Sequence, residues 1–349
     1  MIYGAILLVL SLLSLADQKS QRSVYGAVLA FLFLFMGWRY EVGCDFRGYL
    51  NRFESVSPTA DPLLYLEREE AAFQFITALI RTSGWDYVWL NVISTALILS
   101  GFVVFLRVFV RPVTMLATMF PIAILQLSMS GIRQGIAAAM LMAAASPFIR
   151  GQRIRAALLI LLGSQFHTSV LIFLPLAFVA GRTITVARLI RVTVLLTPVA
   201  LYMMGGQVEE YSNQYIQKIY GEVSSNGAIF RYIFVLVPAV IFLTNWTKFK
   251  AMMAEDIARF NLFATFSSVI VVMAPLAVVS SLALHRMTFY VLPFAVVMLV
   301  YQSYVYRLYP ILGRFHLPII MSITYFAFWS LLSRHATACY IPYQSYIFQ

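Results

Sequence analysis

The sequence predicts an all-α polytopic membrane protein. Hydrophobic residues make up 61% of the 349 positions, and charged residues only 11%. A soluble domain carries about a quarter charged residues, so a soluble fold is excluded. The mean hydropathy of +0.83 agrees. No repeat or soluble domain interrupts the chain, and we therefore interpret residues 1–349 as one transmembrane domain.

About ten apolar runs are expected to cross the membrane as helices. A further run at about 154–180 is expected to enter and return as a broken re-entrant hairpin, which gives 10–12 membrane segments in all. The short amphipathic stretch 71–81 predicts an interfacial helix. Two larger outer-side loops are expected at about 39–86 and 205–228. The ten spans are expected at about 2–16, 24–38, 87–106, 113–130, 133–149, 184–204, 229–246, 260–280, 287–306 and 315–333.

The distribution of basic residues supports this arrangement, because Lys and Arg concentrate in cytoplasmic loops. Six short loops assigned to the inside hold 15 of the 25 Lys and Arg residues and only three of the 14 acidic residues. Both termini then lie outside the cytoplasm. This holds only if 156–180 returns to the side it entered from. If it crosses once, every later loop changes side.

The composition also excludes other classes of protein. The net charge of +11 is scattered over short loops, so nucleic-acid binding is not expected. The first apolar run lacks a cleavage site and is interpreted as a retained span. We expect Cys44 and Cys339 to be free thiols, with a disulfide as the alternative if both face an oxidising compartment. The four histidines have no metal-binding spacing, so neither a metal nor another cofactor is expected.

Candidate site residues gather at the predicted outer ends of the spans. Arg133 is the strongest, in the turn Ser130-Gly131-Ile132-Arg133-Gln134 before an alanine-rich helix. Gln134 follows it, and the exposed N–H groups of such a helix start favour an anion. Several guanidinium groups beside a cavity would bind phosphate or diphosphate oxygens.

Three further stretches contribute candidates. The loop from Arg39 to Tyr49 mixes charge with aromatic side chains, and its Asp45 is expected to stay ionised among arginines. His167 lies at the tip of the expected hairpin, where a neutral imidazole can take a proton from a hydroxyl group. The remaining candidates in these stretches are Tyr40, Arg47, Arg286 and Tyr290.

Four motifs together resemble the EpsG-like branch of the Wzy-type polysaccharide polymerases. They are R-Y-x-V-G-x-D-x-x-x-Y from Arg39, S-G-I-R-Q-G-I-A from Ser130, F-H-T-S from Phe166 and H-R-M-x-x-Y from His285. The resemblance implies a membrane glycosyltransferase without metal or other cofactor, active at the periplasmic face of the bacterial inner membrane. Its product would be O-antigen, capsule or exopolysaccharide. Its partners would be an oligosaccharide linked to undecaprenyl diphosphate, membrane lipid, a flippase and a chain-length regulator.

The resemblance and the residues predict the same roles. Arg133, Arg286, Arg39 and Arg47, with Gln134, are expected to bind the diphosphate, and Tyr40, Tyr49 and Tyr290 the sugars. His167 is the expected base, with Asp45 as the alternative base or as a group that orients an arginine. A flippase or transporter of lipid-linked oligosaccharide and an O-antigen ligase are the alternative functions. Candidates clustered on one side favour an enzyme over a transporter.

Overall fold

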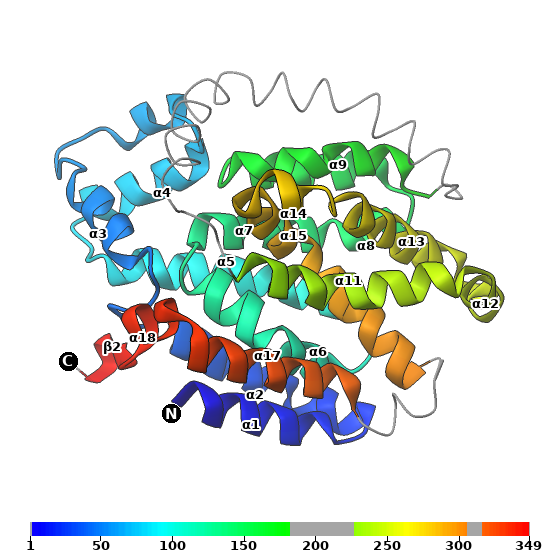
Figure 1. Ribbon diagram of the computed structural model, residues 1–349. Coiled ribbons are helices and arrows are strands. Elements are labelled where there is room, and N and C mark those ends of the chain that lie inside the picture. The colour runs from blue at the N-terminus through cyan, green and yellow to red at the C-terminus, as the bar shows by residue number, and fades with distance from the viewer. Residues whose placement is uncertain (1, 182–226, 306–315, 349) are drawn as a thin grey trace.

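A computed structural model describes residues 2–181, 227–305 and 316–348, and these residues are almost entirely helical (Figure 1). The predicted span 184–204 and nearly all of the outer loop 205–228 lie outside this part. The β structure of the described residues is a two-residue antiparallel ladder between β1 (Arg39–Tyr40) and β2 (Gln344–Ser345). The all-α prediction is therefore confirmed for the described part of the chain.

The α-helices alternate with short 3₁₀ and π segments. The α-helices are α1 (Ile2–Ser14), α2 (Gln18–Gly37), α3 (Phe46–Glu54), α4 (Ala71–Thr82), α5 (Val88–Leu106), α6 (Pro112–Met119), α7 (Ile132–Ala143), α8 (Ala145–Ile149), α9 (Arg153–Ser164), α11 (Ala228–Thr244), α12 (Trp246–Met252), α13 (Ile257–Val272), α14 (Leu276–Val279), α15 (Ser281–Val300), α17 (Leu317–Leu332) and α18 (Arg334–Tyr340). The 3₁₀ segments are η1 (Pro62–Glu67), η3 (Thr168–Val179), η4 (Ala254–Asp256) and η6 (Tyr346–Phe348), and the π segments are η2 (Phe120–Ser128) and η5 (Tyr301–Val305).

The expected count of about ten spans is wrong for the described residues. Five helical stretches are long and apolar enough to cross a membrane, or up to seven if each of two bent pairs is one span. The two pairs, α11 with α12 and α17 with α18, bend by 79° and 83°. Hydrophobicity identified apolar runs, but a crossing also needs about 20 residues of continuous helix. The five stretches are Gln18–Gly37, Val88–Leu106, Ile132–Ile149, Ala254–Val278 and Ser281–Val305.

Other expected spans are too short or interrupted. The first apolar run forms only the 13-residue helix α1. The run predicted at 113–130 starts as an α-helix and widens into a π-helix from Phe120, beside Pro121. Proline lacks the N–H group that a regular helix would use, which explains a break there.

The chain reverses between α9 and η3, as expected for a hairpin. The two arms pack along each other, and their far ends meet where the backbones at Gly151 and Gly181 are in contact. Arg153 closes these ends by donating from Nε to the carbonyl of Ala180, at 3.2 Å. Residues 156–180 therefore return to the end of the molecule from which they start, and His167 lies at the tip.

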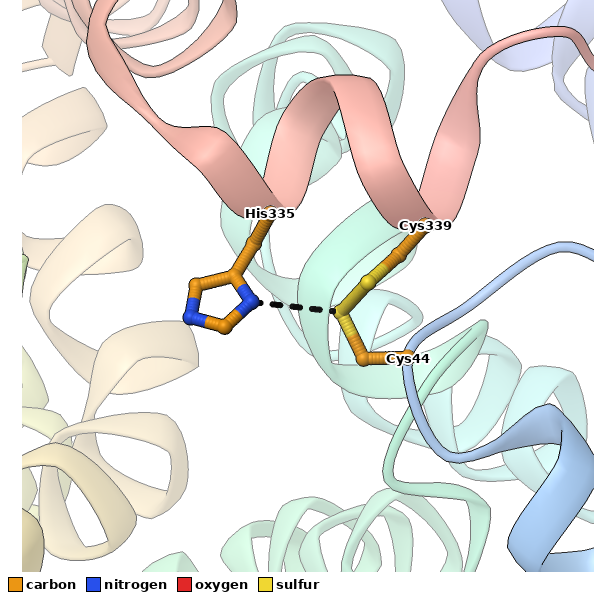
Figure 2. Close-up of side chains that lie close together, drawn as sticks. All are labelled: Cys44, His335 and Cys339. Carbon is orange, nitrogen blue, oxygen red and sulfur yellow. Dashed lines mark hydrogen bonds between the residues drawn. A yellow bond between two sulfur atoms is a disulfide. The ribbon is translucent and has the colours of Figure 1, made fainter.

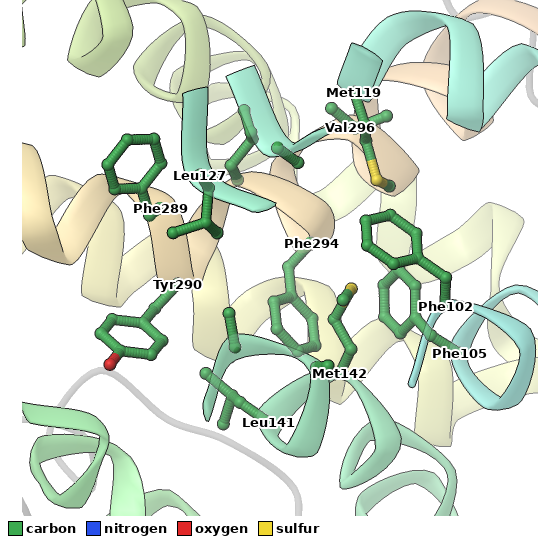
Figure 3. Packing of buried hydrophobic residues seen from close by; sticks show 14 of the residues in the cluster. Phe102, Phe105, Met119, Leu127, Leu141, Met142, Phe289, Tyr290, Phe294 and Val296 are labelled. Carbon is green, nitrogen blue, oxygen red and sulfur yellow. The ribbon is translucent and has the colours of Figure 1, made fainter. Parts of the chain in front are cut away.

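The core is built where helices approach closely. Figure 3 shows aromatic and aliphatic side chains of α5, α7 and α15 interlocking, with Phe105 edge-on to Phe294 at 5.3 Å between ring centroids. Alanines on α7 allow α5 to approach at Gly101. A Cβ atom at Gly101 would lie 2.5 Å from the carbonyl oxygen of Ala139, so only glycine fits this crossing.

The two cysteines form a disulfide, so the expectation of free thiols is wrong. Cys44 and Cys339 are joined across 295 positions of sequence, with 4.8 Å between their Cα atoms (Figure 2). The N–H of Gly43 donates to the carbonyl of Cys339 at 2.7 Å. Gly43 has φ +101°, and a Cβ there would lie 2.0 Å from the carbonyl oxygen of Met129. The sequence could not show that the C-terminal helix returns to this loop.

The charged loops that the structure describes lie at two opposite ends of the molecule, as the sequence predicts. At one end, Arg111 donates to the carbonyl of Ala16 at 3.1 Å, and Arg259 to that of Val108 at 3.2 Å. At the other end lie the disulfide, α3, α4 and the chain termini (Figure 1). There Tyr3 donates to the carbonyl of Tyr340 at 2.7 Å.

We predict that Gly101→Ala destabilises the protein, although alanine is the better helix former. The added Cβ would overpack the α5–α7 crossing at a cost of about 1–3 kcal/mol. Gly26→Ala is the matched control, because nothing lies within 4 Å of its Cβ position, and it should be neutral or stabilise by up to ~1 kcal/mol. Thermal unfolding of both purified variants in detergent measures the difference. Equal loss of stability in both would contradict the close packing.

We predict that neither cysteine of the folded protein reacts with a maleimide until a reductant is added. The disulfide consumes both thiols. In Cys44→Ser, Cys339 should react without reduction. Mass spectrometry of the alkylated protein counts the labels, and a wild-type protein that takes two labels before reduction would contradict the pairing.

Candidate functional site

Three side chains from distant parts of the sequence meet at the hairpin tip. Arg133, in the first turn of α7, forms an ion pair with Glu70, the residue before α4. The other carboxylate oxygen of Glu70 lies 3.2 Å from Nδ1 of His167. We call Glu70, Arg133 and His167 the hairpin-tip cluster. The side chains are 10%, 24% and 18% exposed respectively, so the ion pair is largely withdrawn from water.

Backbone geometry fixes Glu70 beside the hairpin. The N–H groups of Ala72 and Phe73, at the start of α4, both donate to the carbonyl of Gln165, at 3.1 and 3.3 Å. Glu70 itself has φ +56°, a left-handed conformation that is uncommon for a residue with a side chain. The expected interfacial helix at 71–81 is thus the helix α4, and its first turn is joined to the hairpin tip.

Aromatic rings hold the guanidinium of Arg133 in place. It lies over Tyr49 at 5.7 Å and over Phe73 at 5.9 Å from the ring centroids. Such contacts stabilise a cation while leaving its edge available for hydrogen bonds. Arg133 is therefore fixed before any ligand arrives, which a flexible surface arginine is not.

The charges of the cluster influence one another. Burial raises the pKa of Glu70, whereas the Arg133 guanidinium and the N–H of Thr168 favour its ionised form. Burial, with the positive charges of Arg133 and Arg286, lowers the pKa of His167 to about 3. The imidazole is thus neutral near pH 7. A pKa this low makes the imidazole a weak base in the resting site, and the carboxylate of Glu70 lies where it would stabilise the imidazolium that forms on proton transfer.

The second and third turns of α15 add further predicted residues. Gln134 donates from Nε2 to the carbonyl of Arg286 at 2.7 Å, which ties the start of α7 to the start of α15. One turn later the hydroxyl of Tyr290 lies 2.8 Å from that of Ser169, on the hairpin. The structure therefore brings Arg133, Gln134, His167, Arg286 and Tyr290 to one place, and Tyr49 borders it.

Arg39 lies elsewhere, although it was expected among the phosphate-binding residues. It is 1% exposed, and its guanidinium donates to the carbonyls of Met36 and Met129, at 2.6 and 3.1 Å. These bonds tie the end of α2 to the turn before α7. Arg39 thus supports the turn that carries Arg133 and is not at the hairpin tip.

Arg47, Tyr40 and Asp45 also lie outside the cluster. Arg47 pairs with Glu41 at 3.2 Å with 81% of its side chain exposed. Tyr40 packs edge-on against Phe46 and Tyr346. Asp45 borders a separate cavity, and its N–H donates to the hydroxyl of Ser130 at 3.3 Å.

That cavity has a volume of about 1060 Å³ and lies between α11, α17, α18 and the start of α15. Its polar lining includes Arg231, which donates to Oε1 of Gln126 at 2.9 Å. Neither Arg133 nor His167 lines it. The arginines of this end therefore do not share one chamber. Arg133 lies at the hairpin tip and Arg286 is bound through its carbonyl to the neighbouring Gln134, whereas Arg231 lines the cavity.

Glu70 is the functional candidate that sequence reasoning missed. It ends the charged run Glu67-Arg68-Glu69-Glu70, which is typical of a solvated loop. The signal that separates it from its neighbours is position, because it stands immediately before an amphipathic helix. Glu70 is buried by its contact with the hairpin tip, whose residues follow almost 100 positions later in the sequence. No local sequence pattern encodes that contact.

Among the described residues, one group of three side chains has the elements of a metal site. Cys44, His335 and Cys339 place their ligand atoms within 4.8 Å of one another. Metal binding by cysteine needs the thiolate, and both sulfur atoms are held in the disulfide (Figure 2). Nδ1 of His335 lies 3.7 Å from the sulfur of Cys44.

Comparison with known proteins identifies one family. The model of the EpsG family matches residues 22–345, which is nearly the whole chain. No curated protein and no solved structure matches this chain. The matched region includes every residue of the hairpin-tip cluster and of the cavity.

We predict that Glu70→Gln lowers the free energy of unfolding by about 1–3 kcal/mol, because a largely buried guanidinium loses its charged partner. Glu41→Gln removes the carboxylate of the exposed pair with Arg47 and should change stability by less than ~0.5 kcal/mol. Thermal unfolding of the two purified variants makes the comparison. If the Glu70 variant is as stable as the Glu41 variant, the ion pair does not hold the hairpin tip.

Proposed function

Because the chain belongs to the EpsG family, we propose that it is a polysaccharide polymerase of the bacterial inner membrane. Its donor would be a glycan carried on undecaprenyl diphosphate, and its acceptor a lipid-linked oligosaccharide repeat. The family supports a polymerase-type role in general. The identity of the carrier and the residue roles below are our proposal.

The observation that carries the proposal is the meeting of a neutral imidazole with fixed guanidinium groups at the hairpin tip. His167 lies 3.2 Å from Glu70, which pairs with Arg133, and the charge of Arg286 acts on the same imidazole. Glycosyl transfer from a diphosphate needs this combination, because a hydroxyl must lose a proton while a phosphate gains negative charge.

The reaction we propose is a single displacement. The acceptor hydroxyl oxygen bonds to the anomeric carbon of the donor glycan, and its proton passes to His167. The bond from that carbon to the carrier diphosphate breaks, and its electron pair stays on the diphosphate oxygen. Arg133 and Arg286 stabilise the charge that develops there. Arg39 is not part of this proposal, because its guanidinium already binds two backbone carbonyls.

Two observations support a site that faces away from the cytoplasm. The basic loops among the described residues lie at the end opposite the hairpin tip, which the positive-inside rule assigns to the cytoplasm. The disulfide between Cys44 and Cys339 lies at the same end as the hairpin-tip cluster. Disulfides persist in oxidising compartments such as the periplasm.

We predict that Arg133→Lys nearly abolishes long-chain glycan while the protein is still made at a normal level. Lysine keeps the charge but loses the planar fork that binds two phosphate oxygens. Arg47→Lys is the matched control, because Arg47 is exposed at the same end and lies outside the cluster. Electrophoresis of the surface glycan measures chain length.

His167→Ala tests the base in the same assay. We expect single repeats at the cell surface and almost no longer chains, since removing a general base costs about 10²–10⁴-fold in rate. Wild-type chain lengths in either variant would refute its assigned role. Repeats retained inside the cell in a null strain would favour a flippase instead.

A further inference from the structure

The cavity beside α15 is amphipathic. Its polar lining comes from one end of the molecule and contains Arg231 and Arg334, the imidazoles of His285 and His335, and Asp45. The rest of its lining is mainly aromatic and aliphatic and comes from α11 and α17. A volume of about 1060 Å³ is larger than a single sugar needs.

The apolar side of the cavity continues onto the outer surface of the helices. Phe230 and Ile233 on α11 and Phe328 on α17 line the cavity and are also 60%, 48% and 58% exposed. Their exposed apolar area offers the hydrocarbon chain of a lipid a surface to pack against, so such a chain would lie in this part of the cavity in apolar surroundings.

The polar side suits an anion with sugars attached. Arg231 is 8% exposed and donates to Gln126, so its guanidinium is held away from bulk water, where a phosphate that reached it would interact strongly. Arg334 is the first residue of α18. It is exposed and lines the mouth of the cavity. Asp45 cannot bind phosphate, but its carboxylate can accept a hydrogen bond from a sugar hydroxyl.

The start of α15 separates the cavity from the hairpin tip. His285 lines the cavity, and the next residue, Arg286, accepts a hydrogen bond from Gln134 at its carbonyl and places its positive charge near both His167 and His285. Two cationic sites thus lie on two sides of one helix turn, at the same end of the molecule.

We propose that this cavity binds the isoprenoid diphosphate of the acceptor, as a second lipid-carrier site distinct from the hairpin-tip cluster. The inference rests on the proposed function, because a polymerase joins two lipid-linked substrates. The donor diphosphate is the leaving group and must lie at the reacting carbon, beside Arg133 and Arg286. The acceptor reacts through the far end of its glycan, so its own diphosphate must lie away from the base.

Photocapture with a benzophenone-bearing geranylgeranyl diphosphate tests the site directly in purified full-length protein. We expect crosslinked peptides from α11 and α17. Geranylgeraniol and inorganic pyrophosphate, added as competitors, separate recognition of the chain from recognition of the phosphates, and both should compete more weakly than the unlabelled prenyl diphosphate. Crosslinks confined to α7 and the hairpin would overturn the proposal.

Variants of the cavity sharpen this test. Arg334 is exposed, and Arg334→Gln should weaken capture on α11 and α17 about tenfold, the loss expected for one charge-assisted contact, while capture at the donor site beside Arg133 stays unchanged. Arg231→Gln should do the same from inside the cavity. Thr324→Trp, on the exposed cavity side of α17, should block the prenyl probe while leaving the polar mouth intact. Arg47→Gln is the control and should capture the probe normally, and wild-type capture on α11 and α17 in all three cavity variants would overturn the proposal.

Kinetics distinguishes this inference from the proposed catalytic function. With lipid-linked repeat as the acceptor, Arg334→Gln should raise the acceptor KM about tenfold at a kcat near wild type, whereas Arg133→Lys should lower kcat. Normal capture together with full polymerisation by Arg133→Lys would refute the catalytic assignment and leave the cavity site standing. An unchanged acceptor KM in the Arg334 variant would refute the cavity site alone.

Discussion

The arrangement of this end of the molecule depends on the ion pair between Glu70 and Arg133. A guanidinium that is largely withdrawn from water is costly unless a carboxylate pairs with it. By pairing with Arg133 and lying 3.2 Å from His167, Glu70 joins α4, α7 and the hairpin tip at one point. The same carboxylate thus joins three parts of the fold and lies beside the imidazole, which explains why these side chains can be fixed before a substrate arrives.

A second constraint is that neighbouring residues of α15 contribute to two different sites. Its second turn holds His285, which lines the cavity, and Arg286, whose carbonyl accepts a hydrogen bond from Gln134 beside the hairpin tip. Adjacent helical residues point about 100° apart, so one turn can serve two sites without any additional element. The bend between α17 and α18 and the disulfide to Cys44 then bring His335 and Arg334 to the mouth of the cavity. The C-terminal segment thereby contributes to a site whose other parts come from the middle of the chain.

Helix boundaries show where sequence reasoning reached its limit. The apolar runs that became Val88–Leu106 and Ile132–Ile149 were identified correctly, because continuous hydrophobicity and an unbroken helix coincide there. The run beginning at Pro112 did not become a regular span, because its hydrophobicity says nothing about the π-helical break at Phe120. The reversal at His167 was predicted from arginines on both flanks, a rule that depends on charge and not on packing.

For the described part of the chain, the sequence by itself determined the all-helical class, the separation of basic loops to one end and the candidates Arg133, His167 and Arg286. These depend on hydrophobicity and charge, which every residue carries regardless of its neighbours. Tertiary structure alone decided that Arg39 supports a turn, that Cys44 pairs with Cys339, and that Glu70 joins the cluster. Each of these depends on segments that are 63 to 295 positions apart coming into contact, and only the packing of the helices determines which distant side chains meet.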